Sequence, residues 1–320
     1  MRTRHLGEAG PAVGAIGLGC MGMSWGYAES QRDDEQSVAV IRQALDAGAT
    51  HLDTANAYGD GHNERLVGRA LAGRGDDAVV ATKAGIVVDD LRTRSLSRNG
   101  SPDHIRASAE ASLRRLGTDT IDLYYLHRVD SAVALEDSWG CMAELVAQGK
   151  VRRLGLSEVT PEQAERAHRI HPVSAVQSEL SLWSRDALAP GSDMVRWCAE
   201  HGAAFVPFAP LGRGFLTGAF SRPVFEAGDF RSTNPRFTDE AFAANLRIVE
   251  AVRAVGDRHD ATPAQVAIAW ALAQGEHVIP IPGTKSPRFL AENIGAVSLR
   301  LTERDLADLD AVPAAVGDRY

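Results

Sequence analysis

The chain has few cysteines, and they show no pairing pattern. Only Cys20, Cys141 and Cys198 occur among 320 residues, and no two of them form a CxxC motif. An odd number of widely spaced cysteines argues against a disulfide framework and is typical of a protein in a reducing compartment. We therefore expect a cytoplasmic location.

Long apolar runs and basic clusters are missing as well. No window approaches the roughly 18 apolar residues that a membrane-spanning helix needs, and the first residues hold no apolar stretch of signal-peptide length. Lys and Arg are scattered through a chain of net charge −8, so nothing indicates nucleic acid or a membrane as a partner. His168 and His171 have no carboxylate or cysteine beside them to complete a ligand set, so we expect no metal site.

What the chain does contain is an alternation of short apolar runs with longer amphipathic segments, from end to end. Apolar runs without internal alternation are typical of parallel strands that are covered on both faces. No low-complexity stretch or linker interrupts the pattern, so we expect residues 1–320 to form a single domain. The predicted strands are Ala15–Gly19, Thr50–Asp53, Val79–Lys83, Ile121–His127, Val151–Ser157, Ala175–Gln177, Ala203–Pro207 and His277–Ile281.

Helices are predicted between these strands, and several of their starts are well marked. Ser101, Thr160 and Thr262 are hydroxyl N-caps, each followed by a proline at the first helical position. Gln163 and Gln265 complete capping boxes. The predicted helices are Asp34–Ala47, Asn63–Leu71, Pro102–Leu116, Leu135–Ala147, Pro161–Arg169, Asp193–Glu200 and Pro263–Ala273.

Eight strand–helix units in this length predict an α/β fold, a single (β/α)8 TIM barrel, whose usual size is about 250 residues. The surplus residues fall in four segments. An N-terminal hairpin at Arg2–Val13 is expected to cap the bottom of the barrel. A long insertion covers Gly212–Asp239, and extra helices are predicted at about Ala241–Arg258 and Leu301–Val312.

A doubly wound fold is the alternative, because Gly17 to Gly22 spell G-x-G-x-x-G after a candidate strand. That dinucleotide fingerprint requires a helix to open at once, so that its N-terminus meets the pyrophosphate. Here helical periodicity begins only near Asp33. We therefore favour the barrel, in which these glycines allow backbones to approach closely.

Asp53, Lys83 and His127 each stand where a predicted strand gives way to a loop, and Tyr58 follows Asp53 in its loop. Barrel strands open on one face at their carboxyl ends, where active sites are built, so the four side chains should converge. The Lys83 ammonium, kept charged by Asp53, should lower the pKa of Tyr58 from its reference of about 10. Tyr58 would then donate a proton while His127 orients a carbonyl oxygen. A structural ion pair and a core histidine are the alternatives.

At these residues the chain resembles the aldo-keto reductases, and in particular a monomer-type bacterial and plant branch. The resemblance runs in order through essentially the whole chain. Its motifs are Leu52-Asp-Thr-Ala-Asn-Ala-Tyr-Gly59, Thr82-Lys-Ala-Gly85, Ile121-Asp-Leu-Tyr-Tyr-Leu-His127, Gly149-Lys-Val-Arg-Arg-Leu-Gly-Leu-Ser157, Pro210-Leu-Gly-Arg-Gly214 and Pro282-Gly-Thr-Lys285. The resemblance implies that Tyr58 is the general acid, that Lys83 and Asp53 tune it, and that His127 positions the carbonyl.

The resemblance also implies NADPH, bound extended across the barrel mouth without a Rossmann fold. Ser157 and Gln177 match positions that grip the nicotinamide amide, and Glu158 stands where many relatives have Asn. Phe208 matches an aromatic residue that stacks on the nicotinamide, and Met21 lies near its ribose. The pyrophosphate is implied to follow Pro210, Leu211, Gly212, Arg213 and Gly214, and the adenosine half Gly283, Lys285, Glu292 and Asn293.

Two positions depart from the relatives and bear on the choice of coenzyme. Ala219 stands where some relatives have a phosphate-binding Lys, and Phe289 where many have a polar residue. Lys285 and Arg288 would still neutralise a 2′-phosphate, and Arg231 or Arg236 would reach it from the long insertion. NADPH therefore remains the expected coenzyme.

Trp25 and Tyr27 are expected to line the mouth for a mostly apolar carbonyl substrate, with core-capping aromatics as the alternative. Arg128 reaches either this pocket or a surface acid. We therefore expect an NADPH-dependent reductase of an aldehyde or ketone, reversible toward alcohol oxidation, that is a monomer or weak homo-oligomer. Two other functions stay open: an NADPH-binding regulatory or sensor subunit, and a barrel lyase that uses Lys83 as a Schiff-base nucleophile.

Overall fold

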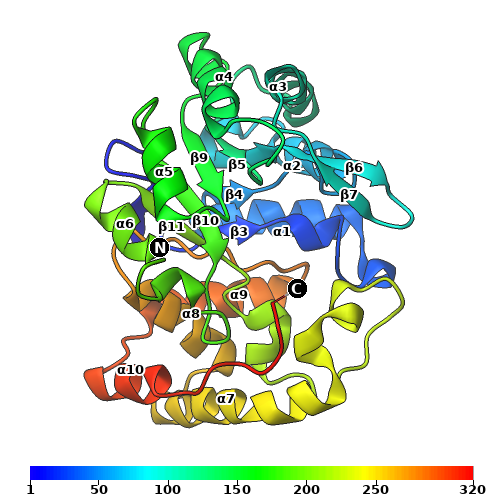
Figure 1. Ribbon diagram of the computed structural model, residues 1–320. Helices are drawn as coiled ribbons and strands as arrows, with labels where there is room; N and C mark the ends of the chain where they lie inside the picture. Colours follow the sequence, from blue (N-terminus) through cyan, green and yellow to red (C-terminus); the bar gives the residue numbers. More distant parts are fainter. Residues whose placement is uncertain (320) are drawn as a thin grey trace.

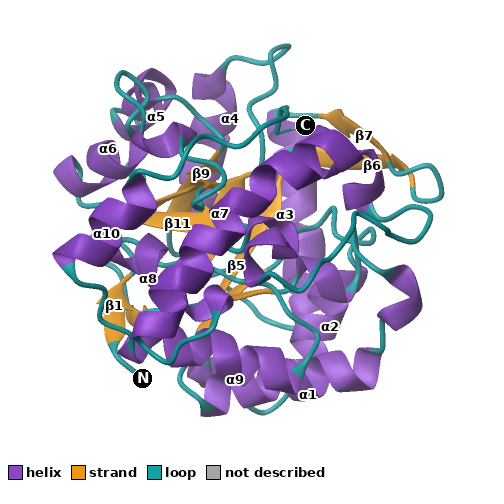
Figure 2. Ribbon diagram, turned by 90° about the horizontal axis from the view of Figure 1, so that it is seen from below, coloured by secondary structure: helices purple, strands orange, loops and turns teal. Residues whose placement is uncertain are grey.

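The computed structural model describes residues 1–319. Seven parallel strands form a nearly closed barrel in the order β3-β4-β5-β8-β9-β10-β11, with helices on the outside (Figures 1 and 2). The strands are β3 (Leu18–Gly19), β4 (His51–Asp53), β5 (Val79–Ala84), β8 (Leu123–Leu126), β9 (Leu154–Ser157), β10 (Ala175–Glu179) and β11 (Ala204–Phe208). The predicted α/β barrel is confirmed.

The helices follow the strands in alternation, as predicted. Three of them, α3, α4 and α8, have the predicted bounds, and the capping boxes of Thr160 and Thr262 are both present. Within residues 1–319 no helix is long and apolar enough to cross a membrane. The helices are α1 (Asp34–Asp46), α2 (His62–Leu71), α3 (Pro102–Leu116), α4 (Leu135–Ala147), α5 (Pro161–His168), α6 (Met194–Glu200), α7 (Asp239–Arg258), α8 (Pro263–Ala273), α9 (Pro287–Gly295) and α10 (Glu303–Asp310).

The eighth strand, predicted at His277–Ile281, is wrong as a regular strand. Residues 277–283 make only isolated bridges to β11 and β3, because Pro280 and Pro282 have no N–H to give to a ladder. The segment still closes the barrel. On one side the amide of Ile279 donates to β11 over 2.8 Å, and on the other the amide of Gly17 donates to Pro280 over 2.9 Å.

Gly17 and Gly19 lie at this closure, where there is no room for a side chain. A Cβ on Gly17 would lie 2.8 Å from the carbonyl oxygen of His51, and one on Gly19 would lie 2.8 Å from that of Ile281. The turn that follows, η1 (Met21–Met23), is a single 3₁₀ turn, and α1 begins only at Asp34. The glycines therefore serve close backbone approach, and the doubly wound alternative is wrong.

Two hairpins are added to the barrel. The first, β1 (Thr3–His5) and β2 (Ala12–Gly14), is antiparallel, and Leu6 and Val13 join the apolar cluster inside the barrel. The predicted N-terminal cap is thus confirmed. The second, β6 (Ile86–Asp90) and β7 (Ser95–Arg98), follows β5 and projects from the barrel (Figure 1). It was not predicted.

Candidate active site

The structure brings Asp53, Tyr58, Lys83 and His127 together where β4, β5 and β8 end. The Nζ of Lys83 lies 2.6 Å from Oδ1 of Asp53 and 3.4 Å from the hydroxyl of Tyr58. The rings of Tyr58 and His127 meet edge to face, with centroids 5.8 Å apart. Asp53 is in register with Ala81, so Lys83, two residues further along β5, points to the same face of the sheet.

The ammonium of Lys83 has three acceptors around it and no exposure to solvent. Besides Asp53 and Tyr58, it donates to the backbone carbonyl of Thr54 over 2.7 Å. Burial by itself lowers the pKa of Lys83, but the charge of Asp53 and the hydrogen bonds outweigh it, and the net direction is upward. Lys83 is therefore a cation whose three hydrogens all point to oxygen atoms.

The expected lowering of the Tyr58 pKa is wrong in direction. Burial raises the pKa of the Tyr58 phenol more than the positive charge of Lys83 lowers it. Burial also lowers the pKa of His127 far below its ordinary value, and the charges of Lys83 and Arg128 add to that effect. At neutral pH the site therefore holds a protonated phenol and a neutral imidazole.

Polar side chains at the ends of β9 and β10 join this cluster. Gln177 donates from Nε2 to Oδ2 of Asp53 over 2.7 Å. Arg128 donates to the hydroxyl oxygen of Ser157 over 3.0 Å and to the carbonyl of His127 over 2.6 Å. Of the two alternatives for Arg128, the structure therefore favours the pocket over a surface acid.

The turn after β11 is tight and carries a positively charged side chain. Gly212, Arg213 and Gly214 have φ of 56°, 57° and 94°, and a Cβ at Gly212 would lie 2.4 Å from Trp183. The amides of Gly212 and Gly214 donate to carbonyls earlier in the same turn, over 2.9 Å and 3.0 Å, so the turn is closed on itself and its positive charge comes from the Arg213 side chain. The Arg213 guanidinium adds positive charge, although it also binds Glu179 over 2.9 Å.

These residues fit a nicotinamide dinucleotide. Buried Ser157 and Gln177 offer hydrogen bonds to an amide, and Phe208 ends β11 as a half-buried aromatic face. The Nδ1 atom of His127 is buried without a partner among the described residues, as expected of a polar atom that a ligand completes. The guanidinium of Arg213 suits a pyrophosphate.

The other predicted coenzyme residues lie in segments that follow β3, β11 and the eighth segment. Lys285 is half-buried and donates to the carbonyl of Ala28 over 3.1 Å. Arg288 is exposed and lies over the ring of Phe289, 5.7 Å from its centroid. Contacts of the coenzyme with this group stay predictions. Its remaining members are Met21 in η1, Pro210 and Leu211 before the turn, Gly283 after the eighth segment, and Glu292 and Asn293 in α9.

Arg231 and Arg236, the two arginines of the long insertion that were expected near the coenzyme, are engaged within the protein. Arg231 pairs with Asp229 over 2.7 Å and lies over the Tyr27 ring, 5.2 Å from its centroid. Arg236 donates to the hydroxyl of Ser184 over 2.7 Å. Tyr27 therefore lies on the side of the coenzyme turn. Trp25 instead faces the β6–β7 hairpin, where Arg94 lies 5.7 Å from its ring centroid.

The sequence analysis missed Glu179, which binds Arg213, and Arg319, which lies beside Glu179. Glu179 is two residues beyond Gln177 on β10, and a strand places such residues on one face, so a signal was present. No sequence signal pointed to Arg319, because no periodic pattern predicts where the last residues of the chain lie. Glu179 is 3% exposed.

Comparison with known proteins identifies relatives along the whole chain. The Aldo/keto reductase family matches residues 15–314. An aldo-keto reductase of Schizosaccharomyces pombe, named with NADP(+), is 40% identical over 324 residues, covering 99% of this chain and 94% of that protein. The structure of a glycerol dehydrogenase from Gluconobacter oxydans is similar with a TM-score of 0.87 and 31% identity, over 96% of this chain and 94% of that one. An aldo/keto reductase of Klebsiella pneumoniae in complex with NADP and acetate has a TM-score of 0.73 and 27% identity, over 100% and 99%.

Proposed function

This chain belongs to the aldo/keto reductase family, and from that premise we propose that Tyr58 is the general acid of its carbonyl reduction. The family and its NADP-bound neighbours make the protein an NADP-dependent oxidoreductase that acts on small carbonyl compounds. The proposal has three parts: the residues that carry out the chemistry, the reversal of the reaction toward alcohol oxidation, and the way the coenzyme is held.

The observation that carries the proposal is the hydrogen bond from Lys83 to Tyr58. The hydroxyl oxygen of Tyr58 accepts from the ammonium over 3.4 Å, so its own hydrogen is directed elsewhere. Asp53 and the Thr54 carbonyl fix the other two ammonium hydrogens. Lys83 thus holds the phenol in one orientation and stands ready to stabilise the phenolate.

In the proposed reaction the bound reduced nicotinamide supplies a hydride to the carbonyl carbon. Tyr58 gives its proton to the carbonyl oxygen, and the phenolate that remains is stabilised by Lys83. His127, neutral and facing the Tyr58 ring, donates a hydrogen bond that fixes the same oxygen. Proton transfer of this kind contributes about 100- to 10,000-fold to a rate. In alcohol oxidation the phenolate would take the proton back.

We assign the coenzyme halves as the resemblance implies. Ser157 and Gln177 hold the nicotinamide amide, Phe208 stacks on its ring, and the turn at Arg213 faces the pyrophosphate. Lys285 supplies charge at the adenosine end. A cytoplasmic location, a single domain, a monomeric or weakly associating state and a mouth lined by Trp25 also stay predictions.

The test compares Tyr58→Phe with Tyr124→Phe. Both remove one hydroxyl from a tyrosine ring, but the Tyr124 hydroxyl donates to the carbonyl of Ile105, away from the site. Tyr58→Phe should lose about 100-fold or more in kcat and keep its NADPH affinity, whereas Tyr124→Phe keeps its turnover. Activity is followed by NADPH absorbance on a panel of aldehydes, ketones and sugars, with NADH in parallel. An unchanged kcat in Tyr58→Phe removes the proposed acid.

The two rival functions make different predictions. A Schiff-base lyase needs a neutral amine, whereas Lys83 is charged, fully buried and bonded to three oxygens. Borohydride in the presence of a carbonyl substrate should therefore leave no adduct on Lys83. A regulatory subunit would bind NADPH tightly with very slow turnover, which steady-state assays on the same panel separate.

A further inference from the structure

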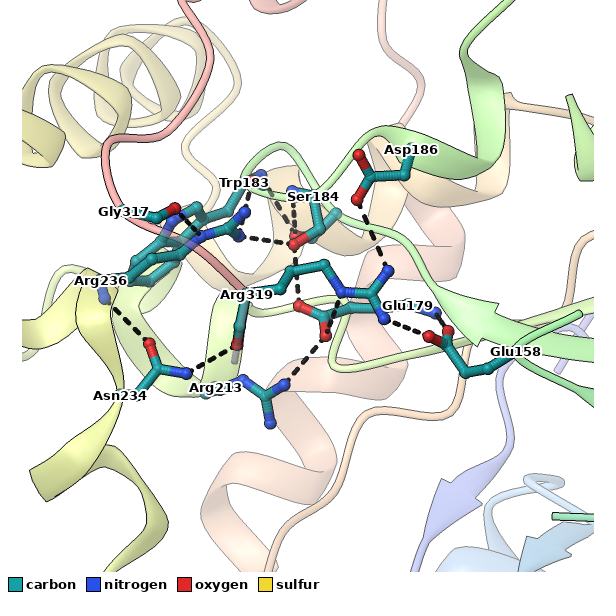
Figure 3. A network of polar contacts seen from close by, with 11 residues as sticks. Glu158, Glu179, Trp183, Ser184, Asp186, Arg213, Asn234, Arg236, Gly317 and Arg319 are labelled. Atoms are coloured by element: carbon teal, nitrogen blue, oxygen red, sulfur yellow. Dashed lines mark hydrogen bonds and ion pairs between the residues drawn. The ribbon is translucent and has the colours of Figure 1, made fainter. Parts of the chain in front are cut away.

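The guanidinium of Arg319 lies among three carboxylates that come from three different segments of the chain (Figure 3). It pairs with Oε2 of Glu158, which follows β9. Its Nε lies 3.4 Å from Oε2 of Glu179, at the end of β10. Its Nη1 lies 3.5 Å from Oδ2 of Asp186, in the turn η4 (Asp186–Leu188). One cation near the end of the described chain thus joins strand ends on which the coenzyme site is built.

Both carboxylate oxygens of Glu158 are engaged by the protein itself. Oε1 accepts from the backbone N–H of Glu179 over 2.9 Å, and Oε2 pairs with Arg319. The backbone of Glu158 is left-handed, with φ of 54°. A carboxylate has no hydrogen to donate, so Glu158 does not supply the donor that an asparagine would give to the nicotinamide amide. Its side chain receives Arg319 instead.

Arg319 also reaches the pyrophosphate turn through Glu179. Oε2 of this buried carboxylate accepts from Nη2 of Arg213 over 2.9 Å, and Oε1 accepts from the hydroxyl of Ser184 over 2.8 Å. If Arg319 lost its charge, Glu158 and Glu179 would have one cation fewer between them. That excess negative charge would stand beside the turn proposed for an anionic pyrophosphate, where it would repel the coenzyme.

Residues 316–319 are held by hydrogen bonds between their backbone and two asparagine side chains, and these bonds do not use the Arg319 side chain. Asn234 donates from Nδ2 to the carbonyl of Arg319 over 2.8 Å. Val316 and Asn245 exchange two hydrogen bonds of 2.8 Å and 3.0 Å. An alanine at position 319 therefore removes the charge and leaves these anchors in place.

We propose that Arg319 is a positioning residue of the coenzyme site, which neutralises Glu158 and Glu179 and so leaves the charge of Arg213 to the pyrophosphate. This inference rests on the proposed placement of the coenzyme. Arg319 acts through other side chains and not on the reacting atoms. It therefore sets the affinity for NADPH and leaves the chemical step alone.

The test measures the dissociation constant of NADPH by fluorescence quenching, together with kcat and the Tm of each variant. The variants are Arg319→Ala, Arg319→Lys, the double variant Arg319→Ala/Glu158→Gln and, as a matched control, Arg304→Ala on the exposed face of α10. Arg319→Ala should weaken NADPH binding about tenfold, with kcat at saturating NADPH within about twofold of wild type. Arg319→Lys keeps the charge and should recover most of the affinity. The double variant should return to within about threefold, because the unpaired carboxylate charge is gone.

Three outcomes overturn the inference. One is NADPH affinity in Arg319→Ala equal to that of the Arg304→Ala control, and another is a double variant as weak as the single one. The third is a lower Tm with unchanged affinity, which assigns Arg319 to stability alone. If the wild-type protein itself did not bind NADPH, the proposed coenzyme site would fail and this inference with it. Normal wild-type binding with unaffected Arg319 variants removes only the inference.

Discussion

Gln177 donates a hydrogen bond from Nε2 to Oδ2 of Asp53 over 2.7 Å. The other oxygen of Asp53 accepts from Lys83, so both oxygens of this 3% exposed carboxylate have a donor. A residue proposed to hold the nicotinamide is therefore bonded directly to a residue proposed for the proton transfer. A substitution of either residue should therefore alter the hydrogen bonding of the other.

Gln177→Leu should lower the free energy of unfolding by about 1–3 kcal/mol, because it leaves one buried oxygen of Asp53 without a donor. NADPH binding should weaken as well. Urea unfolding and fluorescence titration measure the two effects. Gln43→Leu, at an exposed position of α1, should change stability by less than about 0.5 kcal/mol. Equal effects of the two substitutions would contradict the coupling.

Lys83→Met and Asp53→Asn should each cost about 3–5 kcal/mol of stability, since each leaves a buried partner without its counter-charge. The double variant should cost less than the sum of the two, because no unpaired charge remains. Urea unfolding of the four proteins gives the interaction energy. Strictly additive losses would show that the pair is not coupled as the 2.6 Å contact indicates.

Stability should fall as the pH drops below about 6.5, the ordinary pKa of histidine. Burial lowers the pKa of both His127 and His51, so the unfolded chain binds more protons than the folded one in this range, and stability rises with pH. His127→Gln should reduce the slope of unfolding free energy against pH by up to about 1.4 kcal/mol per unit. His5→Gln, at an exposed site, serves as the control. Because His51 also contributes, part of the slope should remain in His127→Gln. A slope as steep as that of His5→Gln would contradict the lowered pKa of His127.

Asp305→Asn should destabilise the packing of α10 on α7 by about 2 kcal/mol without changing NADPH affinity. The buried carboxylate accepts from Arg258 over 2.6 Å and from His259 over 2.7 Å. Burial alone would raise the pKa of Asp305, but the bonds from Thr302, His259 and Arg258 lower it. Its contribution is therefore present at neutral pH and is lost only in strong acid, where the unfolding curves of wild type and variant should converge. Asp308→Asn, at a more exposed partner of Arg258, should cost under about 1 kcal/mol.

The sequence predicted the fold best where local chemistry and tertiary structure agree. Proline after a hydroxyl N-cap marks the starts of α3 and α8, and both helices have the predicted bounds. The prediction of a regular eighth strand was wrong because it relied on the apolar pattern alone. Pro280 and Pro282 have no N–H group to give to a ladder. The β6–β7 hairpin was missed because β7 is fully exposed and lacks the alternation that identifies a strand.

The site was predictable where strand ends determine position. Asp53, Lys83 and His127 follow from the rule that parallel strands open on one face, and the structure brings them together. The direction of the Tyr58 pKa did not follow, because the burial that outweighs the charge of Lys83 depends on packing. The carboxylates around Arg319 were equally out of reach, since that contact joins segments far apart in the chain, with no periodic pattern to connect them.

The barrel is closed on its β3 side by the amides of Gly17 and Gly19, which donate to the carbonyls of Pro280 and Pro282 over 2.9 Å and 3.3 Å. Since the prolines return no amide, this seam is held from one side only, and its protons should exchange with deuterium sooner than those of the continuous ladder between β5 and β8. Gly283 follows directly, so a dinucleotide bound there would stabilise the seam. Slower exchange of the Gly17 and Gly19 amides would then report its binding.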